Sequence, residues 1–117
     1  MDIRRAREAN PSREYNCDLR RLMPWSKVSD GTPWGAAVAT VHPGDATVPH
    51  AHDEDEVFLV LSGRGRMTIG DECEELVAGD LVSIPRNVRH TMANETDTEL
   101  QFLSIYWGEV PEYFERA

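Results

Sequence analysis

Residues 44–63 read GDATVPHAHDEDEVFLVLSG, and this stretch decides the fold and the candidate site. His50 and His52 are separated by one residue, so on a strand they project to the same face. Glu56 begins the apolar run that follows, and His90 lies in a later apolar stretch. Imidazole nitrogens with one carboxylate suit zinc, iron, nickel, copper and, less strongly, manganese. We therefore predict that these three histidines and Glu56 bind one divalent metal ion.

Each of these residues has a plainer interpretation when it is taken alone. A His-x-His pair on a strand is more often a surface pair than a metal site, and His90, beside Arg89, could be a surface residue. The fourth histidine, His42, precedes a proline and has no partner at ligand spacing, so we interpret it as a turn residue. The metal site is favoured because all four predicted ligands occur together in one longer pattern.

From Trp34 onward the chain reads as short strands separated by turns that contain Gly, Pro and Asp. This pattern is typical of an all-β sandwich or barrel, and no stretch beyond Trp34 carries a sustained helical period. The strands are expected at residues 35–42, 46–52, 56–62, 65–69, 73–77, 81–85, 88–94 and 99–107.

The length of 117 residues predicts a single domain. Residues 1–33 are expected to form an N-terminal extension, residues 34–110 the barrel, and residues 111–117 a short helical or frayed tail. Within the extension, residues 2–9 favour a short helix and residues 19–25 favour an extra edge strand.

Charge and composition exclude several classes of partner. The net charge is −9, which argues against nucleic acid because phosphate binding needs a concentrated Lys/Arg surface. No apolar run is long enough to span a bilayer and no signal peptide is recognisable, so a cytoplasmic location is expected. Cys17 and Cys73 are too few for a disulfide framework; free thiols are expected, with a single disulfide as the alternative.

Residues 57–61 and 102–107 form two apolar runs in which polar and apolar residues do not alternate, and Ser104 is the one polar exception. A strand that is apolar on both faces is buried on both faces. One face would line the barrel interior, so the other needs a cover, and a two-fold dimer would supply it. We therefore expect a homodimer.

Strand parity suggests which side chains surround the ion and form a substrate pocket. Phe58 and Val60 share the face of Glu56, and Met92 shares the face of His90. For all the pocket candidates, core packing is an equally good interpretation. One face of the last long strand adds Phe102, Ser104 and Tyr106.

The motifs resemble those of the cupin superfamily. The first cupin motif, G-x5-H-x-H-x3-E-x6-G, is matched at every fixed position by residues 44–63. The second, G-x5-P-x-G-x2-H-x3-N, is matched by residues 79–94, except that Asn87 replaces a glycine. Asparagine tolerates the left-handed conformation best after glycine, so the turn should survive. The resemblance implies a single cupin jelly-roll β-barrel holding one divalent ion (zinc, iron, manganese or nickel), with zinc favoured.

Cupins host many reactions, so three classes of function stay open. The first is a divalent-metal-dependent enzyme acting on a small polar molecule, with an iron- or manganese-dependent dioxygenase or an isomerase among the alternatives. The second is a non-catalytic small-molecule-binding or sensor cupin, and the third is a cupin whose metal is structural. Three histidines and one glutamate leave coordination positions open, which favours the first class over the third.

The flanks of the motifs show a second resemblance. Residues 21–25 (RLMPW), the Trp34-Gly35 pair and residues 102–107 (FLSIYW) look like the cupin module of bacterial hydrazine synthetases. In that family, a zinc cupin works beside a methionyl-tRNA-synthetase-like domain. It rearranges an ester between an amino acid and an N-hydroxylated diamine, which forms a nitrogen–nitrogen bond. The resemblance implies the same reaction here, with the tRNA-synthetase-like partner domain on another chain or separated from this one.

Overall fold

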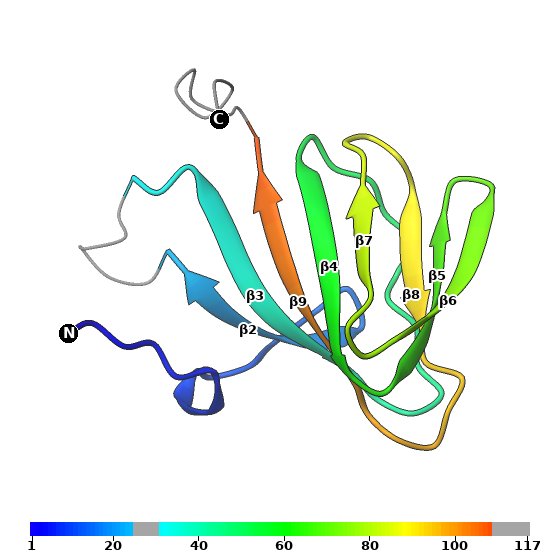
Figure 1. Cartoon of the computed structure of the whole chain (residues 1–117), viewed down its shortest axis with the longest axis horizontal. Coiled ribbons are helices and arrows are strands. Elements are labelled where there is room, and N and C mark those ends of the chain that lie inside the picture. Colours follow the sequence, from blue (N-terminus) through cyan, green and yellow to red (C-terminus); the bar gives the residue numbers. More distant parts are fainter. Residues whose placement is uncertain (25–30, 109–117) are drawn as a thin grey trace.

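The structure is a computed structural model that describes residues 1–24 and 31–108. The described residues contain nine β-strands, one 3₁₀ turn and no α-helix, which confirms the predicted all-β class. The strands are β1 (Ser12–Glu14), β2 (Cys17–Met23), β3 (Trp34–Val41), β4 (Asp55–Ser62), β5 (Arg64–Ile69), β6 (Glu72–Val77), β7 (Leu81–Ile84), β8 (His90–Ala93) and β9 (Leu100–Trp107). Figure 1 labels β2 to β9.

Two antiparallel sheets form a jelly roll. The larger sheet has the order β1-β2-β3-β9-β4-β7, and the smaller has the order β6-β5-β8. The core lies between them, because Phe58 and Phe102 of the larger sheet belong to one buried cluster with Met67 and Met92 of the smaller sheet. Seven of the eight predicted strands are confirmed to within two residues at each end.

The remaining predicted strand, residues 46–52, is wrong. Only two isolated bridges occur there, from Ala46 to Ala93 and from His50 to His90. The reason is local, since Thr47 accepts the amide of Met92 with its side-chain oxygen at 2.8 Å instead of continuing the ladder. The segment also contains a proline, which has no amide hydrogen to donate.

The N-terminal extension differs from prediction in two ways. The helix expected over residues 2–9 is a single 3₁₀ turn at Ala6–Glu8, which fits the marginal stability of very short helices. The expected edge strand, residues 19–25, is present as β2, although residue 25 lies outside the described residues. β1 pairs with the first half of β2 and takes the edge position. The predicted tail, residues 111–117, also lies outside the described residues.

β4 carries apolar side chains on both faces, as its run predicted. On β4 the side chains of Phe58 and Val60 are buried, whereas the alternate residues Val57 and Leu59 are half-buried and Leu61 is exposed. The homodimer that would cover this outer face stays a prediction. Both cysteines are free thiols, as expected. No helix in the described ranges is long and apolar enough to cross a membrane.

Candidate metal centre

A backbone bridge brings the first two sequence-distant ligands together. The amide of His50 donates to the carbonyl of His90 at 3.2 Å, and the amide of His90 donates to the carbonyl of His50 at 2.9 Å. Residues that exchange both hydrogen bonds stand directly opposite each other, and the two ring centroids are 4.4 Å apart. His52 lies one strand period beyond His50, with its ring centroid 5.4 Å from that of His90.

The three histidines could hold one metal ion, because their ligand atoms all lie within 4.8 Å of one another. Backbone carbonyls fix two of the tautomers. The Nδ1 atom of His50 lies 2.7 Å from the carbonyl of Val48, and that of His90 lies 3.1 Å from the carbonyl of Val88. A carbonyl oxygen only accepts, so both Nδ1 atoms donate, and Nε2 is the atom of each neutral ring that is left to bind a metal.

Glu56, the second residue of β4, reaches the same centre. Its side chain is 7% exposed, and its Oε1 lies 3.1 Å from Nε2 of His52 and 3.6 Å from Nε2 of His90. The hydroxyl of Ser104 on β9 donates to Oε2. Burial raises the pKa of Glu56, and the Ser104 hydroxyl and the nearby histidines lower it. The structure thus brings all four predicted ligands together.

A buried polar atom at this centre fits a bound cation. Nε2 of His90 is buried and has no hydrogen-bond partner among the described residues. Burial also lowers the pKa of His90, so its ring is held neutral, which is the form that binds a metal. An unsatisfied buried nitrogen is costly, and coordination to a divalent ion would compensate for that cost.

Aromatic rings hold the histidines from outside the ligand set. The Tyr15 ring stacks on that of His50, with centroids 4.3 Å apart and an interplanar angle of 19°. The Phe58 ring meets that of His90 edge-on at 6.1 Å. Tyr15 is placed by the β1–β2 turn, where Tyr15 and Asn16 both adopt positive φ, as two-residue hairpin turns of this type require.

A cavity of about 140 Å³ opens beside the centre. Four of the predicted pocket residues line it, whereas Val60 and Met92 do not and lie in the core cluster instead. Whether any of them contacts a substrate stays a prediction. The cavity is lined by Phe58, Phe102, Ser104 and Tyr106, and also by Tyr15, Cys17, Leu19, Arg21, Ala37, Ala39, Thr47, His50, His52, Glu54 and Glu56.

Several cavity residues were not predicted from the sequence. Tyr15, Cys17, Leu19 and Arg21 belong to β2 and to the turn before it, outside both motifs. The sequence did contain one signal for these residues. Cys17, Leu19 and Arg21 alternate along the chain, so they share one face if the segment is a strand.

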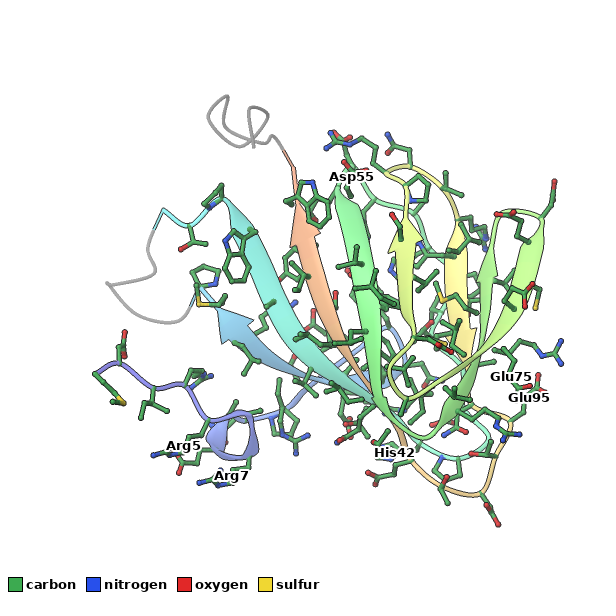
Figure 2. All side chains as sticks on the ribbon, in the orientation of Figure 1. Arg5, Arg7, His42, Asp55, Glu75 and Glu95 are labelled. Atoms are coloured by element: carbon green, nitrogen blue, oxygen red, sulfur yellow. The ribbon has the colours of Figure 1, made fainter. Side chains whose placement is uncertain are left out.

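His42 and Asn87 lie in turns, as predicted, and the carbonyl of His42 accepts the amide of Asp45 at 3.0 Å. Nε2 of His42 lies 2.7 Å from a carboxylate oxygen of Asp18, and Figure 2 shows His42 at the opposite end of the barrel from Asp55, the first residue of β4. Asn87 has a φ of 63°, so it occupies the left-handed conformation for which the family uses glycine. The Asn94 amide donates to the carbonyls of Val41 and Thr98 and closes a loop.

Comparison with known proteins agrees with this fold. The Cupin_2 family model, described as a cupin domain, matches residues 37–106. A solved structure, a Cupin 2 conserved barrel domain protein from Salinispora arenicola CNS-205, superposes with a TM-score of 0.84 at 30% identity, covering 100% of this chain and 98% of that one.

Two curated relatives are enzymes. The chain is 39% identical over 66 residues to the H2HPP isomerase of Bacillus subtilis, covering 56% of this chain and 28% of that protein. It is 38% identical over 72 residues to an acireductone dioxygenase of Bacillus cytotoxicus, covering 55% of this chain and 42% of that protein. The chain thus spans less than half the length of both relatives. The resemblance to hydrazine synthetases gains no support from these matches and stays a prediction.

Proposed function

The chain belongs to the Cupin_2 family of cupin domains, and on that basis we propose that it is a divalent-metal-dependent enzyme acting on a small polar molecule. The observation that carries the proposal is the convergence of three histidines and a buried carboxylate beside a cavity. In two of the histidines Nδ1 donates to a backbone carbonyl, so Nε2 is the nitrogen of the neutral ring that can bind an ion. His50, His52, His90 and Glu56 would be the ligands, with zinc as the favoured ion.

The reaction that we favour is an isomerisation or rearrangement that does not consume oxygen. A bound divalent ion would supply polarisation of a substrate oxygen. The chain's own contribution is to bind and orient the substrate and to limit access of water, since Phe58, Phe102 and Leu19 give the cavity apolar walls. Tyr106 adds a hydroxyl that can donate or accept a proton. The match to an isomerase supports this class of reaction. The expected ester rearrangement that forms a nitrogen–nitrogen bond belongs to the same class.

A dioxygenase is the second candidate function. The match to acireductone dioxygenase supports it, as does the apolar wall formed by the packed rings of Phe58 and Phe102, whose centroids are 4.3 Å apart. Such a wall suits an uncharged diatomic molecule. Iron or manganese would then replace zinc as the native ion.

Metal analysis of protein purified without added metal tests the site. The wild-type chain should retain about one ion per chain, and His52→Ala should lose most of it. His42→Ala is the matched control, because this histidine pairs with Asp18 away from the centre and its loss should leave the metal content unchanged. A full metal complement in His52→Ala would refute the ligand assignment.

The reaction class is tested with the substrates named by the two relatives. Zinc-loaded protein should convert H2HPP, or a small molecule of similar polarity, under anaerobic conditions. Uptake of oxygen with acireductone by the iron-loaded protein alone would favour the dioxygenase. Saturable binding without product in either assay would favour a non-catalytic binding module.

A further inference from the structure

Arg21 is the one cationic side chain among the described residues that line the cavity. It lies on β2 in line with Cys17 and Leu19, which line the cavity too, whereas its neighbour Arg20 has the opposite parity and does not. The chain carries a net charge of −9 and therefore repels anions in general. A single cation at this inward position marks the place where an anion could bind.

The Glu14 carboxylate holds the Arg21 guanidinium in place. It accepts hydrogen bonds from both terminal nitrogens of Arg21, one of them at 3.1 Å. Tyr106 lines the same cavity as Arg21. A guanidinium has five N–H donors in a planar fork, so donors remain after Glu14 is satisfied. Arg21 is thus oriented in advance, and its side chain is still about half-exposed (49%) beside the cavity.

The position of Tyr106 depends on a glycine in the neighbouring strand. Gly35 of β3 pairs with Tyr106 of β9, and a Cβ atom added to Gly35 would lie 2.3 Å from Cε2 and 2.7 Å from the hydroxyl oxygen of Tyr106. The ring therefore lies directly over Gly35. The next inward residues of β3, Ala37 and Ala39, are small and line the cavity. This arrangement keeps the cavity open between Tyr106 and the core.

We propose that the substrate carries a carboxylate, which binds to Arg21 and Tyr106 while a second polar group of the same molecule reaches the metal centre. The metal end of this proposal rests on the proposed function. The fork of an arginine matches a carboxylate in geometry and charge. The cavity of about 140 Å³ is close to the roughly 150 Å³ that accommodates a benzene molecule. The substrate is therefore a short organic acid.

Probes with a metal-binding head test the proposal without knowledge of the substrate. Monohydroxamates of malonic, succinic and glutaric acid each carry a hydroxamate for the ion and a distal carboxylate. The matched alkyl hydroxamates carry a methyl group in place of the carboxylate. Calorimetric titration of the zinc-loaded chain gives the affinity ratio of each pair. For at least one chain length, we expect the hydroxamate with the distal carboxylate to bind about five- to tenfold more tightly than the matched alkyl hydroxamate.

Variants assign that preference to residues. Arg21→Gln should bring the ratio close to one while leaving the affinity for the alkyl hydroxamate unchanged. Tyr106→Phe, which keeps the ring over Gly35 and cannot be dismissed as a packing defect, should lower the ratio about two- to threefold. Arg20→Gln is the matched control on the opposite face of β2 and should keep the wild-type ratio.

The outcomes separate the two proposals. Tight hydroxamate binding with no preference for any acid, or a preference that survives Arg21→Gln, overturns the carboxylate site and leaves the metal centre standing. Failure of every hydroxamate to bind the zinc-loaded wild-type chain overturns the proposed function, and the carboxylate site with it.

Discussion

Replacing Ser104 by alanine tests whether the metal centre depends on residues outside its ligand set. The Ser104 side chain is buried, and its hydroxyl donates to the Glu56 oxygen that does not face the histidines. Removing a hydrogen-bond donor from a buried charged group costs about 1.5–3 kcal/mol. At about 1.4 kcal/mol for each factor of ten, a loss of ~2 kcal/mol corresponds to roughly 30-fold weaker metal binding. This lies within the range of about 10–100-fold known for partners that orient metal ligands.

The same substitution has a predictable pH dependence. The Ser104 hydroxyl lowers the pKa of Glu56, whereas burial raises it. Without the hydroxyl the pKa rises further, so a proton competes more strongly with the metal ion, and the affinity deficit grows as the pH falls. Competition with a chromophoric zinc chelator at pH 7.5 and pH 6 measures both effects.

Ser83→Ala on β7 is the matched control, because Ser83 is exposed and should not affect zinc binding. Ser104→Ala could instead bind zinc as tightly as the wild type at both pH values. That result would refute the inference that Ser104 orients Glu56 and holds it charged for metal binding.

Four further predictions concern stability, reactivity and assembly. Burial raises the pKa of Glu56, so the charged carboxylate destabilises the metal-free fold as the pH rises above the ordinary carboxyl pKa. Glu56→Gln should therefore raise the melting temperature more at pH 8 than at pH 5. A larger increase in melting temperature at pH 5 would contradict this. Burial raises the pKa of Cys17 to about 11, so iodoacetamide at pH 8 should modify the exposed Cys73 and spare Cys17, as peptide mass spectrometry would show. Chelation should leave the circular dichroism spectrum folded, since the core cluster includes none of the metal ligands; global unfolding would show that the ion is structural. The chain should sediment as a dimer at micromolar concentration and Leu59→Glu, on the outer face of β4, as a monomer; a monomeric wild type would refute the expected cover of that face.

The metal centre could be predicted because its determinants are local in the sequence. His50 and His52 were grouped by strand parity, and they lie together although the segment forms only isolated bridges; the spacing to Glu56 belongs to one short motif. His90 is distant in sequence, and its motif assigned it to the same ligand set; the structure adds that it stands opposite His50. Asn87 illustrates the same point for the backbone, since the glycine of the motif at this position and the tolerance of asparagine for the left-handed conformation together predicted its positive φ.

The cavity could not be predicted to the same degree, because its walls depend on which strands become neighbours. Arg21 and Tyr15 line it only because the β1–β2 hairpin adds to the edge of β3. Parity groups Arg21 with Cys17 and Leu19, but it does not say whether that face looks inward. Pairing across strands decides this, and the sequence carries no local signal for a hairpin whose turn has tyrosine and asparagine rather than glycine at its positive-φ positions.

Parity also cannot distinguish two layers on the same inward face. Phe58 and Val60 are neighbours on the inner face of β4, yet Phe58 lines the cavity and Val60 belongs to the core alone. Small residues contribute to this division from β3, which lies beyond β9 in the sheet, where Ala37 and Ala39 line the cavity and leave space that larger side chains would fill. A strand pattern thus fixes direction, whereas cavity depth follows from the summed volumes of side chains on several strands. The sequence therefore predicts the candidate metal ligands but not the extent of the cavity beside them. The structure adds Arg21 to the residues that line this cavity.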